Sequence, residues 1–440
     1  MRILAIDQGT SATKAIVVRD GVVESLAELP VHPTFGPDGA VEQDPSELLA
    51  SVLEAGGEAL AEAGGRVDGV ALANQGETVL AWDPATGHPL TTALVWQDSR
   101  AQEVCDDLAA HADLITARTG LVLDPYFSAP KMAWLRRHRT RDGVVTTTDT
   151  WLIHQLTGAF VTDVTTASRS LVLDVDRIAW DDELLDLFGL GDERMPELVD
   201  CDAPIGAVAA FDAPLVGLAV DQQAALLAES CLGIGDAKCT YGTGAFLLAN
   251  CGARAVRSTA GLTTSVAWRA GGETRYCLDG QVFTAASAVR WLHELGVLDD
   301  ARSLDDAVAE DSGDVRFSPA LAGLGAPWWR SDARGAFTGL GLSTTRGEII
   351  RAVLEGIAAQ VAELARVMGE DIGMIRRLRV DGGLTHSRAL LQIQADLLQA
   401  PIEVYPSAHA TPLGVAALGR LALDPSLTID EVAAGWEPAL

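Results

Sequence analysis

Two short segments of this chain combine glycine with hydroxyl side chains in a way that suits phosphate binding. They are residues 7–11 (DQGTS), followed by Lys14, and residues 241–244 (YGTG). Glycine allows close approach of the backbone, N–H and hydroxyl groups donate to phosphate oxygens, and lysine adds positive charge. Either segment alone also fits an ordinary hairpin turn. Because each half of the chain opens with one, we expect a nucleotide between them, with Asp7 holding Mg²⁺ directly or through water.

A third candidate is a carboxylate that can accept a proton. Asp221 follows residues 214–220, an apolar run that we expect to be a strand, and Gln222 stands beside it. An aspartate at the end of a strand in a cleft is well placed as a general base, with the glutamine amide binding a hydroxyl. A helix N-cap aspartate would produce the same local sequence, so the pattern leaves both interpretations open.

Polar and aromatic residues that follow other expected strands suit a small polyhydroxy ligand. These are Glu77 in residues 74–77 (NQGE), Trp96, and Tyr126 in the loop 124–127. Either aromatic residue would also fit a core position. Residues 381–383 (DGG) end a strand and precede a helix, which is where α/β proteins place the flat part of a nucleotide, although a tight turn has the same sequence.

An α/β fold that repeats itself must position these segments. In the first half we expect strands over 2–6 and 15–18 around the first turn, and a helix over 45–63 with Pro45 at its start. In the second half we expect a strand–turn–strand around 241–244 and helices over 281–295 and 345–367. The repetition predicts two similar domains, residues 1–229 and 230–440.

The composition limits the partners that this chain can have. Hydrophobic residues make up 48% of the 440 residues and charged residues 21%, which excludes a disordered or fibrous protein. The 61 acidic and 32 basic residues give a formal charge of −29, so we expect no nucleic acid and no membrane as partner. With no signal peptide, no membrane-length apolar run and no paired cysteine motif, we expect a soluble cytoplasmic protein. A homo-oligomer is compatible with this sequence.

Two longer patterns resemble the signatures of the FGGY carbohydrate kinase family, within the actin-like ATPase superfamily. Residues 126–135 (YFSAPKMAWL) resemble the first signature and residues 335–356 the second. The shorter motifs are most similar to those of the glycerol kinases, and the resemblance covers nearly the whole chain. It implies an α/β fold of two actin-like (ribonuclease H-like) domains with a nucleotide and substrate cleft between them.

The resemblance also assigns expected roles by position. Asp221 matches the catalytic base and Asp7 the metal-associated aspartate, so Mg²⁺ is expected beside these two carboxylates. The positions that match nucleotide contacts are Thr10, Ser11, Lys14, Thr243, Gly383 and Ser387. The positions that match the substrate pocket are Glu77, Trp96, Tyr126, Asp221 and Gln222. The implied activity is transfer of the γ-phosphoryl group of ATP to a hydroxyl of a small polyol or sugar.

The chain departs from the glycerol kinase pattern at several positions. Gly76 stands where those enzymes carry an arginine that contacts substrate hydroxyls, and Val220 replaces the usual glycine. Lys14 replaces an arginine, and Ala286, Arg290 and Ser387 replace Gly, Gln and Asn. Room beside Gly76 would favour a tetritol, pentitol or ketopentose over glycerol, unless a nearby loop supplies the missing donor. A catalytically weak ligand-binding regulator is a further alternative, which the retained Asp221 and Thr243 disfavour.

Overall fold

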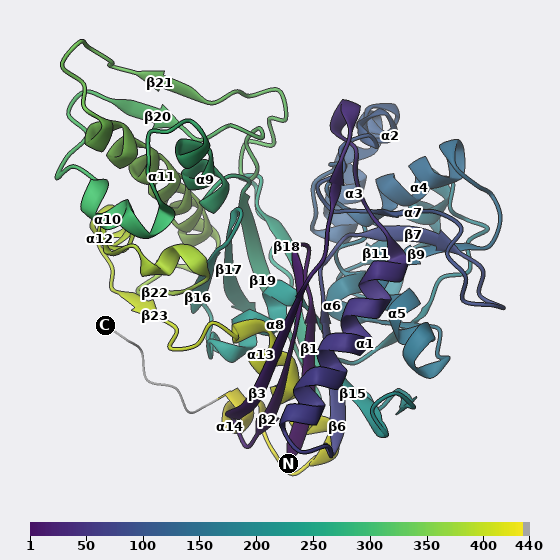
Figure 1. Ribbon diagram of the computed structural model, residues 1–440. Coiled ribbons are helices and arrows are strands. Elements are labelled where there is room, and N and C mark those ends of the chain that lie inside the picture. The colour runs from purple at the N-terminus through teal and green to yellow at the C-terminus, as the bar shows by residue number, and fades with distance from the viewer. Residues whose placement is uncertain (434–440) are drawn as a thin grey trace.

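Two six-stranded sheets form the centres of two lobes (Figure 1). The computed structural model describes residues 1–433, so residues 434–440 of the expected second domain lie outside it. The first sheet has the order β14-β15-β6-β1-β2-β3 and the second β18-β19-β17-β16-β22-β23. In each lobe an antiparallel hairpin and a third strand lie on one side of the first strand, and two parallel strands on the other. This shared topology confirms the expected pair of similar α/β units.

The bounds of these strands follow the chain order. The first sheet contains β1 (Arg2–Gln8), β2 (Ala12–Arg19), β3 (Val22–Pro30), β6 (Gly69–Asn74), β14 (Gly206–Val208) and β15 (Ala213–Val220). The second contains β16 (Ala237–Tyr241), β17 (Ala245–Gly252), β18 (Thr263–Ala270), β19 (Glu273–Val282), β22 (Leu378–Asp381) and β23 (Ile402–Val404). Strands β1 and β6 are buried almost throughout because helices cover both faces of their sheet.

The two covering helices of the first sheet come from opposite ends of the chain. Helix α1 (Pro45–Glu62), whose first turn is capped by Asp44 as expected, packs on the face that carries Leu4 and Ile6. Helix α13 (Ala410–Leu423) packs on the opposite face, which carries Ile3 and Ala5, and against α8 (Asp221–Ala228) (Figure 1). The C-terminal part of the chain therefore completes the core of the first lobe.

Smaller elements surround the two sheets. A five-stranded sheet of β4 (Thr34–Phe35), β5 (Val41–Gln43), β7 (Val79–Trp82), β8 (Ala93–Leu94) and β9 (Val144–Thr147) adjoins the first lobe. Its neighbouring helices are α2 (Gln102–Asp107), α3 (Ala112–Thr119), α4 (Ser128–His138), α5 (Thr148–Thr157), α6 (Val164–Ala167) and α7 (Asp182–Leu187). Two-stranded pairs are β10 (Val161–Asp163) with β13 (Glu197–Val199), β11 (Leu173–Asp174) with β12 (Ala179–Trp180), and β20 (Arg316–Ser318) with β21 (Ala336–Thr338). The second lobe adds α9 (Ala286–Glu294), α10 (Leu304–Ala307), α11 (Arg346–Ile372) and α12 (Arg388–Leu398), and α14 (Ile429–Ala433) follows α13.

Two helix predictions in the second half have different outcomes. The capping box at Thr345 and Glu348 starts α11 as expected, because its signal is local. The helix expected over 281–295 begins too early, since β19 runs to Val282, where it pairs with Ala245, and α9 starts only at Ala286. The apolar and small residues before Ala286 were compatible with either state, and pairing with β17 decides for the strand.

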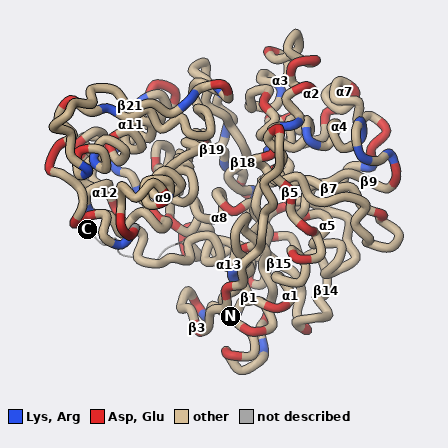
Figure 2. Tube along the Cα trace, turned by 45° about the horizontal axis from the view of Figure 1, so that its top comes forward, with Lys and Arg blue, Asp and Glu red and all other residues tan. Residues whose placement is uncertain are grey.

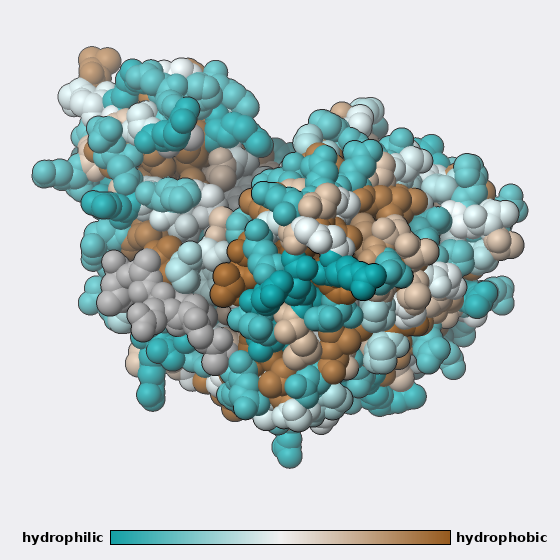
Figure 3. All heavy atoms as spheres, turned by 60° about the horizontal axis from the view of Figure 1, so that its bottom comes forward, coloured by the Kyte–Doolittle hydropathy of each residue, from teal (hydrophilic) through white to brown (hydrophobic). Residues whose placement is uncertain are grey.

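Charge and hydropathy are spread over both lobes. Asp and Glu residues are distributed over the loops and helix ends of each lobe rather than gathered on one face (Figure 2). The space-filling view shows two lobes with a notch between them and a mostly hydrophilic surface (Figure 3). In the part of the chain that is described, no helix is both long and apolar enough to span a membrane.

The crossing of α13 over α8 depends on a glycine. A Cβ atom at Gly414 would lie 1.8 Å from the Ala224 carbonyl oxygen. We expect Gly414→Ala to lower the free energy of unfolding by about 1–3 kcal/mol or more, because the two helices must separate. Gly57→Ala, in α1 with nothing within 4 Å, is the matched control and should stabilise by about 0.5–1 kcal/mol. Urea unfolding of both variants measures this, and equal effects would contradict the packing argument.

Candidate active site

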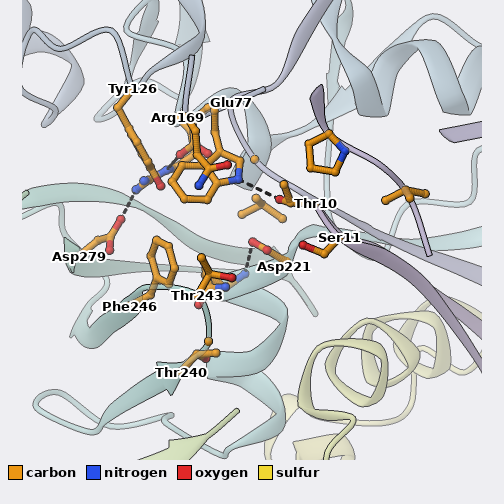
Figure 4. Close-up of a pocket in the computed structure, with 18 of the residues that line it drawn as sticks. Thr10, Ser11, Glu77, Tyr126, Arg169, Asp221, Thr240, Thr243, Phe246 and Asp279 are labelled. Atoms are coloured by element: carbon orange, nitrogen blue, oxygen red, sulfur yellow. Dashed lines mark hydrogen bonds and ion pairs between the residues drawn. The ribbon is translucent and has the colours of Figure 1, made fainter. Parts of the chain in front are cut away.

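A cavity of about 520 Å³ lies between the two lobes, lined by residues of both (Figure 4). From the first lobe, its lining includes Thr10, Ser11, Gly76, Glu77, Trp96, Tyr126, Arg169, Val220, Asp221 and Gln222. From the second lobe, it includes Thr240, Gly242, Thr243, Phe246, Asp279 and Arg290. The cavity thus brings together both predicted phosphate-binding turns, the expected base and the expected substrate wall.

Strand register explains why residues far apart in sequence meet here. In the first sheet, Gln8 of β1 and Val220 of β15 both align with Asn74 of β6. The carboxyl ends of these three parallel strands therefore form one edge, which is where α/β sheets bind ligands. Asp7, Glu77 and Asp221 all lie at or just beyond that edge.

The two hairpin turns approach the cavity from opposite lobes. The turn between β1 and β2 is closed by a hydrogen bond of 3.0 Å from the Gly9 N–H to the Ala12 carbonyl. The turn between β16 and β17 carries Gly242 and Thr243, and its backbone carbonyls accept bonds from the start of α9. Hydroxyl and N–H groups from both lobes can therefore surround one chain of phosphates.

Three residues expected at the nucleotide are not among those that line this cavity. Lys14 lies on β2 opposite Asp7, and its Nζ is 3.5 Å from the Ala408 carbonyl oxygen. Gly383 and Ser387 lie at the start of α12, where the Ser387 hydroxyl donates to Asp305 at 2.7 Å and caps the helix. They stay predictions for the part of the nucleotide that lies beyond the described cavity.

Asp221 begins α8 directly after β15, and Val220 rather than Asp221 is the N-cap. One carboxylate oxygen, Oδ1, accepts the Gln222 N–H at 2.7 Å. Burial raises the pKa of Asp221, and the positive charge of Lys238 acts against that rise. A buried carboxylate with a raised pKa beside a cavity is suited to accept a proton at neutral pH.

Lys238 organises the groups around this carboxylate, and we assigned it no role from the sequence. Its Nζ donates to the Gln222 side-chain oxygen at 2.6 Å and to the Thr240 hydroxyl at 2.7 Å. The bond fixes the Gln222 amide with its oxygen toward Lys238, so the amide nitrogen is free to donate to a ligand.

Asp7 lies close enough to Asp221 for the two charges to interact. Burial, and after it the negative charge of Asp221, raises the pKa of Asp7 to about 7. Two carboxylates that repel one another in a buried place fit a divalent cation, which would offset their charge. The described residues contain no group of three or more metal-ligating side chains, which suits Mg²⁺, since Mg²⁺ takes most ligands from phosphates and water.

The aromatic residues form one wall of the cavity and also link it to the first turn. The Trp96 indole donates to the Thr10 hydroxyl at 2.9 Å. Its ring meets Tyr126 edge-on at 5.6 Å and Phe246 of the second lobe at 5.9 Å. Trp96 and Tyr126 are therefore packed as core aromatics and face the cavity at the same time, so both interpretations apply.

The sequence gave no indication of Arg169, which is the most highly connected charged residue of the cavity. It follows α6, is 3% exposed, and its Nε donates to Glu77 at 2.6 Å, while Nη1 pairs with Asp279. Its partners lie 92 and 110 residues away, so no local motif could reveal the cluster. Burial raises the pKa of Glu77, and the Arg169 charge opposes the rise.

The space beside Gly76 is smaller than expected. A Cβ atom at Gly76 would lie 2.9 Å from Cγ2 of Val220. Because β6 and β15 are adjacent parallel strands, the two departures from the glycerol kinase pattern are in direct contact. Val220 occupies part of the space that the absence of a side chain at residue 76 would otherwise leave.

Comparisons with known proteins agree with this geometry. The N-terminal and C-terminal domain models of the FGGY family of carbohydrate kinases match residues 2–228 and 237–423. The chain is 43% identical to the glycerol kinase of Thermus brockianus, over 94% of this chain and 88% of that protein. It is 42% identical to that of Alkalilimnicola ehrlichii, over 96% and 90%.

Solved structures agree in fold. A glycerol kinase from Plasmodium falciparum with ADP superposes with a TM-score of 0.90 at 33% identity, covering 98% of this chain and 91% of that one. A xylulose kinase from Lactobacillus acidophilus reaches a TM-score of 0.88 at 22% identity, over 98% and 91%, and supports the fold alone.

Proposed function

Because this chain belongs to the FGGY family of carbohydrate kinases, we propose that its substrate is glycerol and that Asp221 is its general base. The chain is an ATP-dependent kinase of a small polyol or sugar, similar to glycerol kinases over nearly its whole length. The observation that carries the proposal is the single cavity in which Asp221 faces both phosphate-binding turns.

In this mechanism, Asp221 accepts the proton of the reacting hydroxyl while the hydroxyl oxygen attacks the γ-phosphorus of ATP. The bond between the γ-phosphorus and the bridging oxygen breaks, and ADP leaves. Hydroxyl and N–H groups of Thr10, Ser11 and Thr243 hold the phosphate oxygens. Such catalysis consists mainly of positioning and charge stabilisation. The Trp96, Tyr126 and Phe246 rings cover the carbon chain of the substrate and exclude water from the reacting atoms.

Mg²⁺ would be held by Asp7 and Asp221 together with phosphate oxygens and water. When bound, it neutralises negative charge on the phosphates. The adenosine contacts are assigned to Gly383 and Ser387, and Lys14 to the first phosphate-binding turn. The division into units of residues 1–229 and 230–440 is part of the same proposal, with α13 returning to the first unit. The free, buried state of all six cysteines supports a cytoplasmic location.

Glycerol, rather than a longer polyol, is supported by two features of the cavity. Val220 fills part of the space beside Gly76. Arg169 places a guanidinium against Glu77, which can supply the donor that residue 76 lacks. A coupled assay of ADP release with ATP, Mg²⁺ and glycerol tests the activity. ADP that forms in step with glycerol phosphate supports the proposal, and no ADP above the blank overturns it.

We expect Thr243→Val to weaken ATP binding by about 1–3 kcal/mol, because it deletes a hydroxyl that faces the phosphates. Lys14→Ala should have a smaller effect, since Lys14 acts only through its charge beside Asp7. Titration calorimetry with ATP checks both values. Thr428→Val, in the turn before α14 at the surface, is the control and should bind ATP like the wild type. Unchanged affinity in both test variants would contradict the two-turn site.

A further inference from the structure

A chain of three buried charges forms part of the cavity wall and crosses from one lobe to the other. Glu77 and Arg169 belong to the first lobe and Asp279, on β19, to the second. Their exposed fractions are 4%, 3% and 3%. Figure 4 shows the Arg169 guanidinium between the two carboxylates, beside the Tyr126 ring.

The hydrogen bonds inside this cluster leave some polar atoms without partners. Arg169 uses Nε for Glu77, and Nη1 for Asp279 and for Ser265 at 3.4 Å. Within residues 1–433, its Nη2 donates to no protein group, and Oδ1 of Asp279 is buried without a partner. A buried donor and a buried acceptor side by side match an alcohol O–H, which accepts and donates one hydrogen bond each.

The surroundings hold these atoms in place. The guanidinium carbon lies 5.7 Å from the centre of the Tyr126 ring and 5.4 Å from that of Phe127. Gln281 donates to Oδ2 of Asp279 at 2.8 Å, so Oδ1 is the oxygen left over. Beside Arg169, the Ser168 hydroxyl accepts the Val266 N–H of the second lobe at 3.0 Å. The donor and acceptor are therefore oriented before any ligand arrives.

We propose that Arg169 and Asp279 bind a hydroxyl of the polyol that is not phosphorylated. This rests on the proposed function and makes both residues determinants of substrate specificity. Asp279 brings the second lobe into substrate recognition, so the hydroxyl site is complete only when the two lobes are together. The ligand class is a polyol with a hydroxyl beyond the one that faces Asp221.

The test compares glycerol with propane-1,2-diol, which keeps a primary hydroxyl and its neighbour but lacks the third hydroxyl. Wild-type kcat/KM should be at least about 10-fold higher for glycerol, because the diol leaves the buried groups unpaired. Arg169→Lys and Asp279→Asn should each lower kcat/KM for glycerol by about 10- to 100-fold and for the diol by less than about 3-fold. The ratio between the substrates therefore falls in both variants.

Arg136→Lys is the matched control, because Arg136 forms a mostly buried pair with Glu193 that does not line the cavity. It should leave the substrate ratio unchanged. Equal losses on both substrates in Arg169→Lys and Asp279→Asn would mean a purely structural role and overturn the proposal. If these variants do not fold, wild-type enzyme decides alone, since equal kcat/KM for glycerol and the diol overturns it. Wild type without activity on glycerol would instead refute the proposed function.

Discussion

Asp221→Asn is expected to lower kcat for phosphoryl transfer by about 10²- to 10⁴-fold, the usual contribution of a general base. The variant keeps the shape of the side chain and an oxygen that can accept the Gln222 N–H. It removes the carboxylate that would take the proton. It also removes a buried charge that interacts with Asp7, so we expect the protein to be at least as stable as the wild type.

The measurement is single-turnover phosphotransfer, with thermal unfolding as the check on the fold. Asp181→Asn is the matched control, because Asp181 is also buried and near the start of a helix, where it accepts the Leu184 N–H at 3.1 Å. Asp181 lies outside the cavity, so this variant should keep its kcat. Near-full turnover in Asp221→Asn would show that another group is the base.

Gly76→Arg is expected to lower kcat/KM for glycerol by about 10²-fold, although it introduces the residue that glycerol kinases carry there. The new side chain collides with Val220, whose Cγ2 lies 2.9 Å from the position of the added Cβ. Val220 directly precedes Asp221, so a shift of Val220 moves the base, and a displacement of about 1 Å can cost this much.

The double variant Gly76→Arg with Val220→Gly should recover most of the lost kcat/KM, because the collision is gone. Val220→Gly alone serves as the control for the loss of the buried valine. The comparison is a double-mutant cycle on kcat/KM. Additive effects of the two substitutions would contradict the contact between residues 76 and 220 as the cause.

The parts of the fold that the sequence predicts well have local causes. Asp44 with Pro45, and Thr345 with Glu348, mark the starts of α1 and α11 because each cap satisfies N–H groups a few residues away. The glycine and threonine turns likewise identify the hairpins that open both sheets. The start of α9 was wrong because pairing between β17 and β19, which no local pattern shows, extends the strand to Val282.

The candidate site follows the same division. Asp221, Glu77 and Trp96 stand beside recognisable strand ends, so the sequence indicates them. Arg169 is attached to its partners only by tertiary structure, because α6 and β19 bring it to Glu77 and Asp279. The contact between Gly76 and Val220 likewise depends on the register of β6 and β15. Chemistry carried by a motif could be predicted, and the polar wall opposite it could not.

The most direct test of the central claim is kcat/KM of the wild-type enzyme for glycerol, compared under the same conditions with erythritol, xylitol and xylulose. A cavity with Val220 beside Gly76 and Arg169 beside Glu77 predicts that glycerol is favoured by at least about 10-fold. Its kcat/KM should reach about 10⁵ M⁻¹s⁻¹ or more, as in an efficient enzyme. A higher value for any of the longer substrates would contradict the account and show that the exchange at residue 76 has changed the substrate.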